Sequence, residues 1–281
     1  MKLLLLSLAI AVSATLLSHA AEPAVHVYKR IGERELTLEV ITPPDWRAGD
    51  LRPALVLFHG GSWTGGARSQ FARQAEHFAS RGLVSVLVTY RLVPKDTKEP
   101  PLVCVQDAKS AMRWVRAHAA ELGTDPQRLG AGGGSAGGHL AAFASLVEGL
   151  DDPQDDLTVS PKAAALILFN PVFDNGPDQG WGHERVGDLY RQYSPAHHVT
   201  PAAPPTLVML GTHDNLIPVA VVERFKAAMD RAGVRCDALY YEGQGHGFFN
   251  PGKSENDRYY HETLRAADDF LVSLGWLPPV K

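Results

Sequence analysis

Glycines surround a serine in the segment GAGGGSAGGH, residues 130–139, and two kinds of chemistry fit their spacing. Residues 132–137 satisfy G-x-G-x-x-G, the loop that lets a backbone approach the pyrophosphate of a dinucleotide. Residues 133–137 satisfy G-x-S-x-G, a strand-to-helix turn that exposes a nucleophile, which here is Ser135. The two interpretations exclude each other, so the rest of the chain must decide between them.

A dinucleotide site needs a further acidic residue about 20 positions beyond the glycines, at the end of the next strand, to hold a ribose hydroxyl. The acidic residues at that distance lie in a polar loop before the strand: Asp151, Asp152, Asp155 and Asp156. No lysine follows the glycines, which excludes a P-loop as well. The sequence therefore favours the nucleophile, and we expect no organic cofactor.

A serine hydroxyl becomes a good nucleophile when a neutral imidazole accepts its proton and a carboxylate fixes the tautomer of that imidazole. Asp214 follows the apolar run 206–210, and His246 follows the run 238–241. Both positions are strand ends, and the chain order is Ser-Asp-His. We predict that Ser135 is the nucleophile, His246 the base and Asp214 the acid, with the nearby Glu242 as an alternative acid.

A glycine-rich loop, HGGSW at residues 59–63, follows an early apolar run. The tetrahedral intermediate of acyl transfer carries a negative oxygen, which preorganised N–H groups stabilise. We predict that the amides of Gly61, Ser62 and Ala136 form this oxyanion hole, Ala136 being the first residue of the helix after the serine. Trp63 either lines the substrate pocket or fills the core beside this loop.

The elements that must position these residues alternate along the chain. Continuous apolar runs, typical of parallel strands buried on both faces, occupy residues 54–58, 83–88, 163–169 and 206–210. Helical patterns occupy residues 70–81, 105–122, 136–148, 219–232 and 255–274. A short antiparallel pair is expected before them, at residues 25–30 and 35–41. The alternation predicts an α/β fold, a mostly parallel doubly wound sheet with helices on both faces and working loops at the carboxyl ends of its strands.

Four segments resemble the α/β-hydrolase serine esterases, and most of all their bacterial acetylxylan and feruloyl esterase-like branch: residues 59–63, 133–138, 211–214 and 245–249. The related hormone-sensitive-lipase-like esterases usually carry HGGG, GDSAGG and a helical cap before the core. Ser62 and Gly134 replace the third glycine and the aspartate here, and few residues precede the first strand. We therefore expect no large N-terminal cap.

The resemblance implies an α/β-hydrolase fold and a serine carboxylesterase without metal or cofactor. Its expected substrates are short-chain acyl esters, such as acetyl or feruloyl esters on plant polysaccharide fragments. Trp63 and Trp181 are expected to bind such a substrate with their flat apolar faces. The polar segment 171–205 is expected to form a lid or pocket wall.

Two other functions fit part of the pattern. HGG-x-W also resembles kynurenine formamidase-like amide hydrolases, and a hydrolase fold that has lost catalysis can serve as a binding module. Expected export disfavours the first, and the complete set of three catalytic residue types disfavours the second.

The first 20 residues predict a secretory signal, because Lys2 precedes an apolar run over 3–17 and a small residue stands at Ala20. The run is shorter than the roughly 20 residues that span a bilayer. We expect cleavage after Ala20, one α/β-hydrolase domain over 21–281, and a secreted or periplasmic protein that does not bind membranes. The net charge of −4 without long basic runs disfavours nucleic acid, and the sequence leaves the oligomeric state open.

The remaining candidates are expected to be structural, except that the histidines at 197–198 are expected to be either structural or substrate-facing. His59 is expected to brace the glycine loop through its ring nitrogens, and His139 to be packed and hydrogen-bonded. The pair at 197–198 lacks the spacing of metal ligands, so no metal is expected. Asp107 is expected as an early-helix charge.

The two cysteines are expected to be unpaired. The topology places Cys104 near the carboxyl ends of the strands and Cys236 at the start of the last strand. A disulfide requires Cα atoms within about 7 Å, which this layout does not allow.

Overall fold

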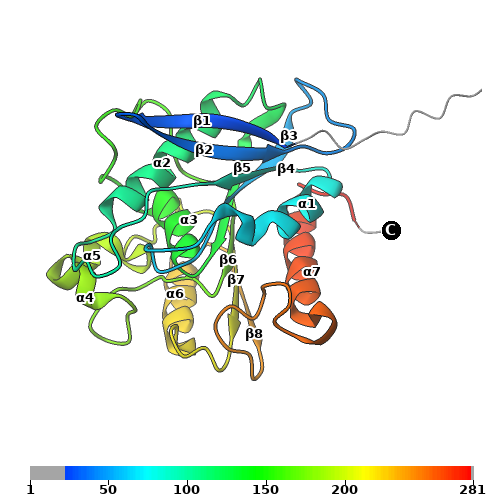
Figure 1. Ribbon diagram of the computed structural model, residues 1–281. Helices are drawn as coiled ribbons and strands as arrows, with labels where there is room; N and C mark the ends of the chain where they lie inside the picture. Colours follow the sequence, from blue (N-terminus) through cyan, green and yellow to red (C-terminus); the bar gives the residue numbers. More distant parts are fainter. Residues whose placement is uncertain (1–22, 280–281) are drawn as a thin grey trace, which may run out of the picture.

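The computed structural model describes residues 23–279 and places eight strands in one twisted sheet (Figure 1). The strand order across the sheet is β1-β2-β4-β3-β5-β6-β7-β8. β2 pairs antiparallel with β1 and β4, and all other pairs are parallel. The strands are β1 (Ala24–Ile31), β2 (Arg34–Ile41), β3 (Arg52–Phe58), β4 (Val84–Val88), β5 (Thr124–Gly134), β6 (Leu166–Phe169), β7 (Thr206–Gly211) and β8 (Cys236–Tyr241).

Helices cover both faces of the sheet (Figure 1). One face carries α2, α3 and α6, and the other carries α1 and α7. The longer helices are α1 (Ala72–Ser80), α2 (Leu102–Ala117), α3 (Ala136–Leu146), α6 (Val219–Arg231) and α7 (Arg258–Ser273). The one-turn pieces are α4 (His183–Val186), α5 (Tyr190–Tyr193), η1 (Arg68–Phe71), η2 (Gly187–Leu189), η3 (Pro195–His197) and η4 (Glu255–Asp257).

The continuous apolar runs reflect this double cover. In β3, Val56 packs into the core beneath α2, α3 and α6, while Leu55 and Leu57 pack into the core beneath α1 and α7. Because side chains alternate between the faces of a strand, a strand covered on both faces is apolar at every position. The predicted doubly wound sheet with helices on both faces is thus confirmed.

The central strand β5 is absent from the predicted apolar runs. Its second half is LGAGGG, whose glycines carry no apolar side chain to signal a buried strand. There is no room for a larger residue, because a Cβ at Gly132 would lie 2.7 Å from the carbonyl oxygen of Ile167 on β6. The neighbouring backbones therefore select glycine where a strand usually shows valine or isoleucine.

A buried ionic network joins β1 to α2. The Lys29 ammonium lies 2.8 Å from Asp107 and 2.6 Å from Asp152, and Arg91 lies 2.7 Å from Asp107. Asp107 has no exposed surface. The expectation of an early-helix charge is therefore wrong, because this carboxylate lies beyond the first turn of α2 and neutralises two cations.

The signal prediction at residues 1–20 lies outside the described residues. Within residues 23–279, no helix is both long and apolar enough to cross a membrane.

Candidate active site

Ser135 forms the turn between β5 and α3. Its backbone adopts φ 53° and ψ −119°, a conformation that non-glycine residues rarely take. Its amide donates to the carbonyl of Phe169 at 2.9 Å, and its own carbonyl accepts from His139 at 3.0 Å. The surrounding hydrogen bonds thus hold a strained backbone in place, as is common at functional sites.

The glycines that flank the serine allow two backbones to meet. A Cβ at Gly137 would lie 2.0 Å from the carbonyl oxygen of Phe58 at the end of β3, and a Cβ at Gly133 would lie 2.5 Å from the same atom. Any larger residue would separate the turn from β3, which carries the HGGSW loop at its end. The G-x-S-x-G spacing therefore reflects close packing beside the serine.

Asp214 and His246 are in contact. The carboxylate follows β7, and its Oδ2 lies 2.8 Å from His246 Nδ1. Its Oδ1 accepts the backbone amides of Leu216 and Ile217, each at 2.9 Å. The side chain of Asp214 has no exposed surface, whereas 19% of the His246 side chain is exposed. The carboxylate is thus fixed by two amides and turns its free oxygen to the imidazole.

Asn170 lies between Ser135 and His246. Ser135 bonds to Phe169, the preceding residue, while the Asn170 side-chain Nδ2 lies 3.4 Å from His246 Nε2. Within residues 23–279, no hydrogen bond joins the Ser135 hydroxyl to His246 directly. Hydrogen bonds between a nucleophile and its base are often long without substrate and tighten when it binds.

The HGGSW loop lies beside the nucleophile. A Cβ at Gly60 would be 3.5 Å from Ser135 Cβ. The next three residues all have positive φ, at 118° for Gly61, 58° for Ser62 and 61° for Trp63. In the described part of the chain, the amides of Gly61 and Ser62 donate no hydrogen bond, and Gly61 and Ser62 both reach the surface.

Ala136 adds a third free donor to this corner. It is the first residue of α3, so its amide has no partner within the helix, and the helix dipole favours negative charge at this end. The three amides predicted for the oxyanion hole are therefore unpaired donors, one on the residue after the serine and two on the loop that passes beside it.

His59 braces the glycine loop, as predicted. The ring is buried, its Nδ1 lies 2.8 Å from the carbonyl oxygen of Gly60, and it stacks on Tyr90 with ring centroids 4.3 Å apart. The Tyr90 hydroxyl in turn donates to the His59 carbonyl at 2.8 Å. Burial lowers the pKa of His59, which favours the neutral ring.

The structure contradicts the prediction that Trp63 lines the substrate pocket. Its side chain has no exposed surface and packs edge-on to His139 with ring centroids 5.0 Å apart. Trp181 lies over it, with centroids 5.2 Å apart, and is itself only partly buried. Trp63 therefore fills the core beneath the 171–205 segment, and a role for Trp181 in substrate binding stays a prediction.

The other candidates have structural surroundings. His139 is fully buried and its Nε2 lies 2.7 Å from the Tyr193 carbonyl oxygen, as predicted, and burial lowers its pKa to about 4. His198 contacts the Arg191 carbonyl at 2.8 Å. No cluster of three or more potential metal ligands occurs between residues 23 and 279.

Both cysteines are free and buried, on α2 and at the start of β8. Burial raises the pKa of each thiol to about 12. Neither is therefore a thiolate at neutral pH.

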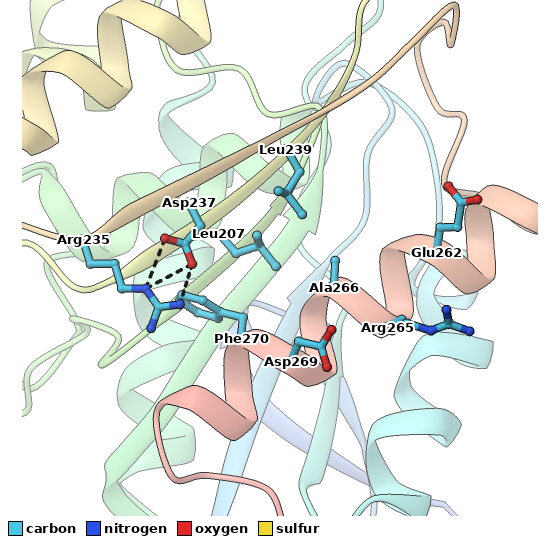
Figure 2. Close-up of a pocket in the computed structure, with 9 residues that line it drawn as sticks. All are labelled: Leu207, Arg235, Asp237, Leu239, Glu262, Arg265, Ala266, Asp269 and Phe270. Carbon is cyan, nitrogen blue, oxygen red and sulfur yellow. Dashed lines mark hydrogen bonds and ion pairs between the residues drawn. The ribbon is translucent and has the colours of Figure 1, made fainter. Parts of the chain in front are cut away.

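A groove of about 390 Å³ lies between β7, β8 and α7 (Figure 2). It is lined by Leu207 near the start of β7, by β8 residues such as Asp237 and Leu239, and by α7 residues such as Phe270. The serine and histidine loops follow the opposite, carboxyl ends of their strands. The groove is therefore distinct from the candidate site.

Three amide side chains near the site were missed by the sequence reasoning: Gln70, Asn170 and Asn250. Of these, Asn170 had a signal, because it follows the apolar run of β6 directly and so stands at the carboxyl edge where working residues were expected. Gln70 lies in the one-turn helix η1 and Asn250 in the loop after His246, and only the folded structure brings them together.

Comparisons with known proteins identify the family. A family model described as BD-FAE matches residues 38–175, and the prolyl oligopeptidase family model matches residues 160–270. The structure of Thermogutta terrifontis esterase 2 phosphorylated by paraoxon is 43% identical, with a TM-score of 0.85, and the match covers 92% of this chain and 96% of that one. The chain belongs to the α/β-hydrolase family of carboxylesterases. Its eight-stranded sheet is accordingly the α/β-hydrolase fold that the four motifs implied.

Curated relatives agree on the class of enzyme. The probable carboxylic ester hydrolase LipM of Mycobacterium tuberculosis is 32% identical over 205 residues, which are 64% of this chain and 46% of LipM. Esterase LipC of the same organism is 30% identical over 230 residues, 72% of this chain and 56% of LipC. The chain thus spans about half the length of these relatives.

Proposed function

We propose that this carboxylesterase hydrolyses short-chain acyl esters through an acyl-enzyme on Ser135. The observation that carries the proposal is the Asp214–His246 contact of 2.8 Å beside a serine held at φ 53° and flanked by unpaired amides. Nucleophile, base, acid and oxyanion donors come from four separate strand ends. A buried structural serine has no need of this set of partners.

The proposed mechanism begins with proton transfer from the Ser135 hydroxyl to His246 Nε2 as the oxygen attacks the ester carbonyl. Asp214 accepts the Nδ1–H bond and stabilises the imidazolium. The negative oxygen of the tetrahedral intermediate accepts hydrogen bonds from the amides of Gly61, Ser62 and Ala136. His246 then protonates the departing alcohol. In the second half, a water gives a proton to His246 as it attacks the acyl-enzyme, and His246 returns this proton to Ser135 Oγ as the acid leaves.

Short acyl groups are the proposed substrates. Structures of the esterase 2 relative are described as propionate-bound and butyrate-bound, and they are 43% and 42% identical to this chain. Our finer proposal is that the ester is an acetyl or feruloyl group on a plant polysaccharide fragment. Trp181 is only partly buried, which makes it the candidate aromatic contact for a sugar ring, and the predicted export signal would bring the enzyme to such polymers.

A series of p-nitrophenyl esters from acetyl to octanoyl tests the acyl preference. We expect kcat/KM to be highest for acetyl to butyryl esters and to fall for octanoyl esters. A preference for octanoyl esters would contradict the short-acyl proposal. Acetate release from acetylated xylan tests the finer proposal, and its absence from every acetylated glycan would leave a short-chain esterase of other substrates.

Two controls separate this proposal from its alternatives. A formamide substrate included in the same series detects the kynurenine formamidase-like activity, which we expect to be weaker than ester hydrolysis. Ser135→Ala, purified free of host esterases, should lower kcat by at least about a thousandfold. Equal turnover by this variant and the native protein would rule out the acyl-enzyme.

A further inference from the structure

A chain of amide hydrogen bonds runs from the HGGSW loop to His246. The Gly60 amide donates to Gln70 Oε1 at 2.7 Å, and Gln70 Nε2 donates to Asn250 Oδ1 at 3.0 Å. Asn250 Nδ2 then donates to the carbonyl of Gly247 at 2.8 Å. The Gly247 amide in turn donates to Asn170 Oδ1 at 2.9 Å, and Asn170 Nδ2 lies 3.4 Å from His246 Nε2.

The orientation of each side-chain amide in this chain is forced by the backbone. The Gly247 amide can only donate, so it faces the oxygen of Asn170 and turns the Asn170 NH₂ group toward His246. By the same reasoning, the Gly60 amide fixes Gln70, and the Gly247 carbonyl, which can only accept, fixes Asn250. The side chain that meets His246 Nε2 is therefore a donor.

A buried aromatic cluster holds the three amide residues in place. Phe71, Phe169 and Phe249 each adjoin one of them in the chain and are almost completely buried. The ring centroids of Phe169 and Phe249 lie 4.7 Å apart, and those of Phe71 and Phe249 lie 5.7 Å apart. Rigid packing of these rings fixes the backbone from which the amides project. Asn170 itself has φ 35°, which asparagine tolerates better than most residues.

His246 has two partners of opposite character. Asp214, after β7, is the charged group in contact with the ring and accepts the Nδ1–H bond, while Asn170, after β6, presents a neutral donor to Nε2. Together they favour the neutral tautomer with the proton on Nδ1 and a lone pair on Nε2. A base that takes the serine proton needs this tautomer.

We propose that Asn170 is a positioning residue that keeps His246 Nε2 unprotonated, and that Gln70 and Asn250 tie this arrangement to the oxyanion loop. The inference rests on the proposed role of His246 as the base. When substrate binds, the serine hydroxyl takes the place of the Asn170 NH₂ group as the donor to His246 Nε2. The imidazole is then already in the tautomer that accepts the serine proton.

Asn170→Asp is the sharpest test, because it changes the group that faces the imidazole and keeps its size. One carboxylate oxygen still accepts the Gly247 amide, while the other replaces the NH₂ donor by an acceptor. That acceptor favours a proton on Nε2 and also favours the imidazolium. We expect the plateau of kcat to fall at least about tenfold with little change in KM, and the acidic limb of the pH profile to move up by about one unit.

The tautomer can also be read without activity. Imidazole ¹⁵N shifts of His246 at high pH should report the Nδ1–H form in the native protein and a larger fraction of the Nε2–H form in Asn170→Asp. The matched control is Asn215→Asp, which adds the same charge at an exposed position next to Asp214. Solvent screens that charge, so kcat should stay within about twofold and the pH profile within about 0.3 units.

A second variant covers the case in which Asn170→Asp does not fold. Asn170→Gly keeps the backbone conformation at φ 35° and removes the donor, so kcat should again fall at least about tenfold, without an upward shift of the acidic limb. Suppose both Asn170 variants fold and keep the native kcat and pH profile, while Ser135→Ala and His246→Ala are inactive. This result would overturn the role of Asn170 and leave the proposed function standing. Active Ser135→Ala and His246→Ala would instead overturn the proposed function.

Discussion

The two oxygens of Asp214 have separate tasks. Oδ1 accepts hydrogen bonds from two backbone amides, and Oδ2 accepts a hydrogen bond from Nδ1 of His246. The sequence predicted this residue because an acid is expected after the strand that precedes the histidine strand. It could not predict the amide donor on the other side of the ring, because the role of Asn170 depends on where the Gly247 amide lies.

Asp214→Asn should abolish most activity while the fold is retained. The Leu216 and Ile217 amides would hold the asparagine oxygen in the place of Oδ1, which turns the NH₂ group toward His246 Nδ1. The ring would then carry its proton on Nε2 and could not accept the serine proton. We expect kcat for p-nitrophenyl acetate to fall by about four orders of magnitude. A loss below tenfold would show that the Asp214 contact does not control the tautomer.

His139 should make the protein less stable in mild acid. Burial lowers its pKa to about 4, whereas in the unfolded chain it has the ordinary value of 6.5. Between these values the unfolded chain binds the extra proton, so stability falls as the pH drops from 6.5 toward 4. At pH 5 the loss should be about 2 kcal/mol relative to pH 7.

His139→Gln is the matching control, because glutamine can still donate to the Tyr193 carbonyl but does not titrate. We would measure the free energy of unfolding by urea titration at pH 7 and at pH 5. The decrease between the two pH values should be about 2 kcal/mol smaller in His139→Gln than in the native protein. Equal pH dependence in both proteins would show that His139 titrates normally in the folded state.

The elements were predictable where one pattern dominates. The apolar runs of β3, β4, β6 and β7 follow from cover on both faces of the sheet, and the structure confirms them. β5 was indicated only by the strand-to-helix motif at Ser135 and not by an apolar run, because close packing of neighbouring backbones requires its glycines. The sequence left open whether Trp63 lines the pocket or fills the core, because local sequence does not show which side of a loop its side chain takes.

The ionic network that joins α2 to β1 is expected to stabilise the fold, and this can be tested. Asp107→Ala would leave Lys29 and Arg91 with fewer partners at a site where Asp107 is fully buried. We expect the free energy of unfolding to fall by about 3 to 5 kcal/mol in urea titrations. Glu33→Ala, in the exposed turn between β1 and β2, should change it by less than about 0.5 kcal/mol. Similar small changes in both variants would mean that the network does not stabilise the fold.

The molecule as a whole brings its chemistry to one edge of the sheet. The loops after β3, β5, β6, β7 and β8 meet there, while the groove of Figure 2 lies toward the amino ends of β7 and β8. Parallel strands make this edge predictable, because their carboxyl ends meet. The acyl group was not predictable in the same way, since the segment 171–205 that adjoins the site shows no pattern tied to one substrate.

Export is a predicted property of the chain as a whole. We propose that residues 1–20 direct secretion and are removed, as their charge and apolar run predict. When the full chain is expressed in a bacterial host, the intact mass of the exported protein should correspond to a chain that begins at Ala21. An unprocessed chain confined to the cytoplasm would contradict the prediction.

The most direct test of the account is covalent labelling with a fluorophosphonate, followed by peptide mapping. An activated serine should take one label per chain, lose esterase activity in proportion to the label, and carry it on the peptide that contains Ser135. Ser135→Ala should take no label. Label on another serine, or ester hydrolysis that persists in a fully labelled protein, would contradict the claim that Ser135 is the nucleophile.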